Sequence, residues 1–184
     1  NLVTDSLMAI AIGLEPREDN IMEEKPRDAS KSFFAGGLGI KIGWQGVMLG
    51  VLSFAAFVIG FFIYPATQAE LQDAELLRAS RLMNASTMTF MVLALSQLFH
   101  AFNIKSQQKS ILKSKVNKFL IGAFVLSLAL QLLTIVFPFT REIFHLSSLN
   151  LVEWLIVLAL SITPVIVVET QKLISRLIKS KKER

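Results

Sequence analysis

The stretch IGWQGVMLGVLSFAAFVIGFFIY, residues 42–64, contains no charged side chain. A helix of about 20 apolar residues crosses the hydrocarbon core of a bilayer, which is about 30 Å thick. The stretch therefore predicts a transmembrane helix. Three further stretches are also predominantly apolar, and a shorter apolar one opens the chain; their approximate bounds are 87–103, 119–137, 151–168 and 1–15.

The composition agrees with a membrane protein. Of the 184 residues, 53% are hydrophobic and 18% are charged, whereas soluble domains carry about 25% charged residues. The predicted fold class is all-α: a polytopic membrane helical bundle with five transmembrane segments, the first truncated at its N-terminus. Because no Met precedes Asn1 and no signal peptide is recognisable, we expect a fragment of a longer protein. The absence of Cys excludes disulfides and thiolate metal sites.

Lys and Arg are distributed unevenly among the predicted loops. Only Arg78, Arg81 and Arg141 lie in the second and fourth loops, and the other sixteen of the 19 lie in the first loop with its flank, the third loop and the tail. The positive-inside rule then predicts that the first loop, the third loop and the tail are cytoplasmic. The basic tail is expected to face anionic lipid rather than nucleic acid. The predicted partner is therefore the lipid bilayer.

Ionisable residues are rare within the predicted spans, which makes each one a functional candidate. Asp5 lies in the first segment with Asn1 and Thr4, and at about 100° per residue all three fall in one arc of a helix. Their carboxylate, amide and hydroxyl oxygens are hard ligands of the kind that Ca²⁺ binds in sets of about six to eight. We therefore predict part of a cation site at Asn1, Thr4 and Asp5. The alternative is a polar seam that packs against another helix.

A fourth candidate ligand is Gln97, in the middle of the third long span. A buried Gln more often forms a hydrogen bond to another helix, so both roles stay open. No Gly-rich phosphate loop, Ser-His-Asp grouping or paired-His motif is present, and no catalytic or cofactor-binding residue is predicted.

The remaining polar residues are given structural interpretations. Glu153 is expected to be solvated near the outer interface, and Glu169 is expected to cap a helix or pair with Lys172. His100 is interpreted as structural, because no second His or Cys accompanies it. The small residues of the second segment are expected to allow close helix packing: Gly46, Gly50, Ser53 and Gly60.

Several short motifs follow one another along these spans. They are NLVTD (1–5), GLEP (13–16), IM (21–22), KPRD (25–28), WQG (44–46), LSQLFHAFN (95–103) and VETQK (168–172). As an ordered set that covers essentially the whole chain, they resemble the sixth to tenth transmembrane helices of type II P-type calcium-transporting ATPases, and residues 95–103 are similar to bacterial members.

The resemblance implies a pump with ten membrane helices, in which ATP with Mg²⁺ phosphorylates an Asp in a cytoplasmic domain. The phosphorylation, nucleotide and actuator domains and helices one to five would precede Asn1, so the chain would be part of a translocase without being competent alone. The positions of Asn1, Thr4 and Asp5 correspond to the family's ion ligands on the sixth helix. A Glu and backbone carbonyls of the fourth helix would complete the site. The transported ion would be Ca²⁺, across a bacterial plasma membrane with the C-terminus in the cytoplasm.

Two departures from the family pattern bear on the mechanism. Gln97 stands where two-calcium pumps have a Glu, so we expect one Ca²⁺ per cycle. Met8 stands where the family usually has Pro, which helps to unwind the sixth helix around the ion because it lacks an N–H. Met8 can donate the backbone hydrogen bond that Pro cannot, which disfavours unwinding. The charge of Asp5, which needs solvation inside the bilayer, favours it.

Two further expectations concern coupling. Without an ion, a carboxylate at Asp5 inside the bilayer is expected to bind a proton, which predicts proton counter-transport. The charged first loop, residues 15–32, is expected to contact the phosphorylation domain. Two alternatives remain open: a free-standing helical scaffold or channel subunit, and a pump for Mn²⁺ or another cation.

Overall fold

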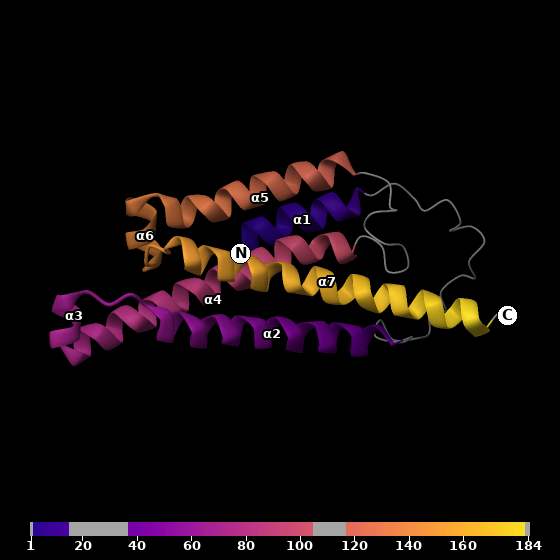
Figure 1. Ribbon diagram of the computed structural model, residues 1–184. Helices are drawn as coiled ribbons and strands as arrows, with labels where there is room; N and C mark the ends of the chain where they lie inside the picture. Colours follow the sequence, from indigo (N-terminus) through magenta and orange to yellow (C-terminus); the bar gives the residue numbers. More distant parts are fainter. Residues whose placement is uncertain (1, 15–36, 105–116, 183–184) are drawn as a thin grey trace.

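The computed structural model describes residues 2–14, 37–104 and 117–182. Within these ranges the chain forms helices and no strand (Figure 1). Two short helices lie at one end of the bundle, here called the α3/α6 end, and the C-terminus lies at the other, here called the tail end. The helices are α1 (Leu2–Gly13), α2 (Leu38–Ile63), α3 (Gln68–Gln72), α4 (Ala74–Ile104), α5 (Lys118–Val136), α6 (Pro138–Phe144) and α7 (Leu151–Lys182).

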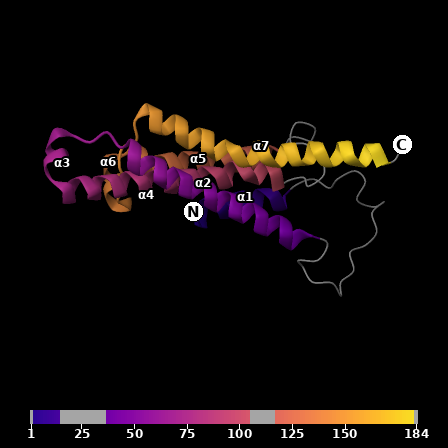
Figure 2. The same cartoon turned by 60° about the horizontal axis from the view of Figure 1, so that its bottom comes forward.

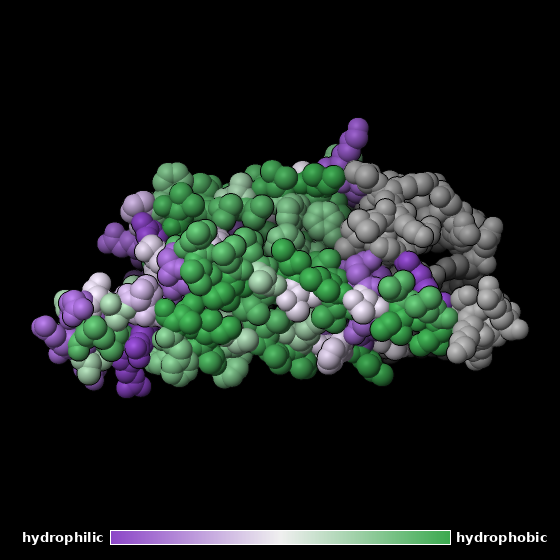
Figure 3. Space-filling model, viewed as in Figure 1, coloured by the Kyte–Doolittle hydropathy of each residue, from purple (hydrophilic) through white to green (hydrophobic). Residues whose placement is uncertain are grey.

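Four of these helices are long and apolar enough to cross a membrane: α2, α4, α5 and the Leu151–Ile178 part of α7. The shorter α1 is also apolar. Large apolar side chains face outward, as shown by Phe54 and Phe62, which are 68% and 71% exposed. Figure 3 shows apolar residues over most of one face between the ends, with hydrophilic residues gathered at the α3/α6 end. Such a surface is expected of helices solvated by lipid, and the predicted all-α membrane bundle is confirmed.

Two helices are longer than the predicted spans. The sequence placed a span at 87–103, but α4 begins at Ala74, and α7 continues from the predicted end at residue 168 to Lys182. The added turns of α4 carry Arg78 and Arg81. The length of an apolar run indicates how much of a helix lies in the hydrocarbon core of the membrane. The helix itself can extend beyond the hydrocarbon core, as long as its backbone hydrogen bonds continue. The other predicted bounds agree with the helices to within a few residues.

The α4 helix is the centre of the bundle. It contacts α2, α7, α1 and α5, and its interior residues Met88, Met91 and Val92 have no exposed surface. The outer helices bury narrower stripes. In α7 the stripe recurs every three or four residues, at Glu153, Val157, Ser161, Pro164 and Val168.

The α2 and α4 helices approach each other closely at Gly60. A Cβ atom on Gly60 would lie 2.8 Å from Met88 Sδ and 3.0 Å from Ala85 Cα. The packing role predicted for Gly60 is therefore confirmed, and Ser53 is also buried. Among the residues that the structure describes, nothing lies within 4 Å of a Cβ at Gly46 or Gly50, so these two glycines do not pack closely against another described helix. The sequence shows small residues but not which of them face α4.

We expect the substitution Gly60→Ala to destabilise the protein by about 1–3 kcal/mol, the usual cost of overpacking an interior. Met88 Sδ can move, but Ala85 Cα belongs to a helix backbone and cannot. Gly50→Ala is the matched control, because its methyl group meets open space and alanine favours a helix. Denaturation of the detergent-purified variants measures both effects. Equal stability of the two variants would contradict the close approach.

A hydrogen-bonded turn joins α2 to α4 at the α3/α6 end. Thr67 and Glu70 form a capping box around α3, and the Tyr64 hydroxyl donates to Glu70 Oε1 at 2.7 Å. Hydrogen bonds from the Ser80 side chain, the Thr67 backbone and Tyr64 lower the pKa of Glu70 to about 2. This turn is therefore held by an ionised carboxylate over the physiological pH range.

Candidate cation site on α1

The α1 helix has a packed face and an exposed face. Thr4, Met8 and Ala11 are buried, while Asp5 is exposed. Asp5 is the only ionisable residue of α1. It lies in the first described turn of this helix. A carboxylate therefore stands at the edge of the packed face, one residue beyond Thr4.

Two views agree that α1 begins midway between the ends of the bundle (Figures 1 and 2). The turn that carries Thr4 and Asp5 therefore lies at mid-length of the bundle. An ionised group at that depth is costly unless it is paired or binds a cation. Position and chemistry together make this turn the candidate site.

The α5 helix holds α1 through two hydrogen bonds to backbone carbonyls. Ser127 Oγ donates to the Thr4 carbonyl at 3.1 Å, and Asn117 Nδ2 donates to the Ala11 carbonyl at 3.1 Å. Ala11 belongs to the last turn of α1, where carbonyls lack helical donors. Asn117 also caps α5, since its Oδ1 accepts from the Phe119 and Leu120 amides. The candidate turn is thus positioned by a neighbouring helix.

The predicted ligands are placed as follows. Asn1 lies outside the described residues. Thr4 faces inward and Asp5 outward from the same turn. Gln97 Oε1 is buried on α4 and has no hydrogen-bond partner in the part of the chain that the structure describes. No group of three or more His, Asp or Glu is found among those residues, so α1 offers part of a ligand set.

The turn around the candidate ligands is regular. Leu2–Gly13 forms one uninterrupted α-helix, so the unwinding that the charge of Asp5 was expected to favour is not seen there. Met8 has the backbone N–H that a proline would lack. The helix is unbroken at this position.

A second polar cluster ties α4 to α7 near the tail end. Asn103 Nδ2 lies 3.2 Å from His100 Nδ1 and donates to the Pro164 carbonyl at 3.3 Å. Lys172 Nζ lies 3.0 Å from Glu169 Oε1 and donates to the Asn103 carbonyl at 3.3 Å. The predicted pairing of Glu169 with Lys172 is confirmed. His100 takes part in helix packing, which agrees with its structural interpretation.

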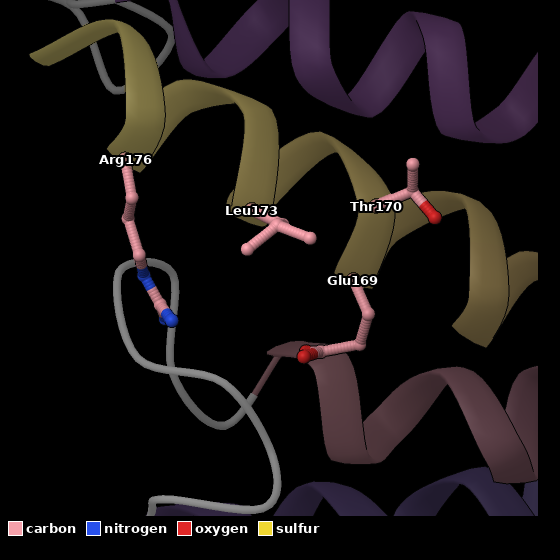
Figure 4. Close-up of a pocket in the computed structure, with 4 residues that line it drawn as sticks. All are labelled: Glu169, Thr170, Leu173 and Arg176. Carbon is pink, nitrogen blue, oxygen red and sulfur yellow. The ribbon is translucent and has the colours of Figure 1, made fainter. Parts of the chain in front are cut away.

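An open hollow lies beside this cluster on α7 (Figure 4). Glu169 and Arg176 extend from the same side of the helix with Leu173 between them, and Thr170 points away. Because the Glu169 carboxylate is paired with Lys172, the hollow does not offer an uncompensated charge to a cation.

Glu153 is the residue that the sequence analysis misplaced. It was expected to be solvated, but it is 1% exposed. Its Oε1 accepts from Asn84 Nδ2 at 2.7 Å, and its Oε2 accepts from the backbone N–H of Asn150 at 2.7 Å. Both oxygens are therefore engaged by N–H donors, which makes this a structural contact and not a second cation site. The signal that could have found it is Asn84, an amide in a membrane helix that needs a partner.

Comparison with known proteins gives a consistent result along the chain. The family described as "Cation transporting ATPase, C-terminus" matches residues 1–174. The chain is 38% identical to Calcium-transporting ATPase 1 of Bacillus cereus over 94% of its own length and 20% of that protein. It is 33% identical to the Calcium-transporting ATPase of Bacillus subtilis, over 89% of the chain and 17% of that protein. A plant relative, Calcium-transporting ATPase 3, endoplasmic reticulum-type, of Arabidopsis thaliana, is 29% identical over 96% of the chain and 19% of its own length. The chain thus spans about a fifth of the length of these relatives.

Proposed function

Because the chain belongs to the C-terminal family of the cation-transporting P-type ATPases, we propose that it forms the second half of the membrane domain of a calcium pump. In this role α1 supplies ion ligands, and α2, α4, α5 and α7 form the scaffold that holds it. The relatives named as calcium-transporting ATPases support Ca²⁺ as the cargo. The ATP site, its Mg²⁺ and the phosphorylated Asp belong to other parts of the pump.

The observation that carries this proposal is the exposed carboxylate of Asp5 at mid-length of an apolar bundle. Exposing a carboxylate to the lipid hydrocarbon is energetically costly. Asp5 therefore needs a cation and further protein around it. Helices one to five of the pump are the partner that would cover this side of α1, and the fourth of them would contribute the missing oxygens.

The ligands available on this chain set the charge of the site. Asp5 brings one negative charge, and Asn1 and Thr4 bring neutral oxygens. Gln97 Oε1, which is buried without a partner among the described residues, is a fourth neutral donor. A site with so little negative charge favours one Ca²⁺ per cycle. When the ion leaves, Asp5 would take up a proton. The pump would carry this proton across the membrane in the direction opposite to Ca²⁺.

The distribution of charge fixes the proposed orientation. The predicted first loop, third loop and tail carry sixteen of the 19 Lys and Arg, and all three join helix ends at the tail end of the bundle (Figure 1). We therefore propose that the tail end and the C-terminus lie in the cytoplasm. The relatives from Bacillus support a bacterial plasma membrane as the location. The loop of residues 15–32, predicted to contact the phosphorylation domain, lies outside the described residues.

A calcium titration of the full-length pump tests this function. Phosphoenzyme formed from ATP is measured as free Ca²⁺ is raised from nanomolar to millimolar, with Mn²⁺ in a parallel series. We expect phosphorylation to depend on Ca²⁺ and to need a higher concentration of Mn²⁺. If only Mn²⁺ activates phosphorylation, the transported ion is Mn²⁺ and not Ca²⁺. If phosphorylation depends on neither ion, the chain does not contribute to a binding site for Ca²⁺ or Mn²⁺.

A further inference from the structure

Ser127 is a fully buried polar residue in the middle of the apolar helix α5. It is 0% exposed, and its hydroxyl donates to the backbone carbonyl of Thr4, 3.1 Å away on α1. The partner is therefore the same turn that carries Asp5. The ion ligands proposed above do not include Ser127, and its burial calls for another explanation.

Several other hydroxyl residues in these helices donate to a carbonyl of their own helix. Ser6 donates to the Leu2 carbonyl and Ser161 to the Val157 carbonyl, four residues back in each case. The same local bond is available to any helical serine. Thr89, Thr163 and Thr170 also use it. Ser127 instead donates to a neighbouring helix, so its bond fixes one helix against another.

Two bonds together fix both the rotation and the axial position of α1. The Thr4 carbonyl is held by Ser127, and the Ala11 carbonyl, about 10 Å further along the helix, is held by Asn117. With Thr4 turned toward α5, the side chain of Asp5 follows about 100° around the axis. This rotation places Asp5 on the exposed side of α1, where the rest of a pump would meet it.

We propose that Ser127 is a positioning residue for the cation site. Its hydroxyl holds the first turn of α1 in the rotation at which Thr4 and Asp5 bind the ion. This inference rests on the proposed function, since it presumes that the ion binds at this turn. Ser127 acts through the Thr4 backbone and is not itself a ligand.

The test is a calcium titration of the Ser127→Ala variant of the full-length pump. Loss of one buried hydrogen bond is expected to raise the Ca²⁺ concentration for half-maximal phosphorylation about threefold to tenfold, while the maximal level changes little. Ser127→Thr keeps the hydroxyl and is expected to return half-saturation toward the wild-type value. If the alanine variant does not fold, Ser127→Cys, with a similar size and a weak donor, is expected to give a smaller shift.

Ser161→Ala is the matched control. Ser161 is also 0% exposed and donates to a backbone carbonyl, but that carbonyl belongs to its own helix. A general loss of packing would affect the two alanine variants alike, whereas only Ser127→Ala should change half-saturation.

The outcomes separate this inference from the proposed function. If Asp5→Asn disturbs calcium dependence but Ser127→Ala or Ser127→Cys leaves half-saturation unchanged, the positioning role is wrong and the site stands. If Asp5→Asn itself leaves calcium dependence intact, the site on α1 is wrong and the role of Ser127 falls with it.

Discussion

Replacing Asp5 with asparagine in the full-length pump is expected to abolish calcium-dependent phosphorylation in the micromolar range. Asp5 is the only ionisable residue of α1, and the proposed site has no second charge from this chain. Removing one partner of a buried ionic contact costs about 3–5 kcal/mol. Since each 1.4 kcal/mol corresponds to about a factor of ten in affinity, half-saturation should rise at least about 100-fold. Phosphoenzyme formed from ATP over a Ca²⁺ series measures this shift.

Glu75→Gln is the charge-matched control for Asp5→Asn. Glu75 is an exposed carboxylate in the first turn of α4, at the α3/α6 end. Its neutralisation changes the net charge by the same amount at a distance from the candidate turn, so half-saturation should stay at the wild-type value. Equal shifts in the two variants would indicate a long-range charge effect. No shift in Asp5→Asn would leave the polar turn of α1 as a packing seam, the alternative that the sequence also allowed.

The membrane helices were the part of the fold that the sequence predicted well. Apolar runs about as long as the bilayer is thick have few other uses in a protein with 18% charged residues. The end of a helix is a different matter, because it depends on where backbone bonds can still be satisfied. The segment that contains Arg78 and Arg81 is polar enough to resemble a loop, yet it forms the first turns of α4.

Packing across helices was less predictable, because it depends on which residues meet. Gly46, Gly50 and Gly60 look alike in the sequence, but within the described ranges only Gly60 faces a neighbouring backbone. Glu153 lies 69 positions from Asn84, and nothing in the local sequence links the two. A polar residue near the end of an apolar run can be solvated or buried, and tertiary contacts decide between these outcomes.

The candidate site shows the same division. Spacing alone identified Thr4 and Asp5 as neighbours on one helical arc. It did not show that the edge of the packed face passes between them, because that depends on Ser127 and Asn117 of α5. The sequence therefore predicted the candidate ligands, and the structure added the two residues that hydrogen-bond to the backbone of their helix.

The buried carboxylate of Glu153 joins four parts of the chain at the α3/α6 end. Its Oε1 accepts from Asn84 Nδ2, which also donates to the Gly60 carbonyl of α2 at 3.1 Å. Asn84 Oδ1 accepts from Ser147 Oγ at 2.9 Å, and Glu153 Oε2 accepts from the Asn150 amide. The network therefore links α2, α4, the 145–150 connection and the start of α7.

Glu153→Ala is expected to destabilise the pump by about 3 kcal/mol, because a buried donor left without a partner costs about 1–3 kcal/mol and the missing side chain adds a cavity. Denaturation of the detergent-purified variants measures the loss of stability. Glu142→Ala, which removes an exposed carboxylate at the same end, is the control and should stay within about 0.5 kcal/mol of wild type.

Asn84→Ala and the double variant Asn84→Ala/Glu153→Ala complete a double-mutant cycle. Residues in contact should show a coupling energy of about 0.5–3 kcal/mol. Additive losses would mean that Asn84 and Glu153 contribute separately. A Glu153→Ala variant as stable as Glu142→Ala would mean that this carboxylate is solvated in the assembled pump, as the sequence had suggested.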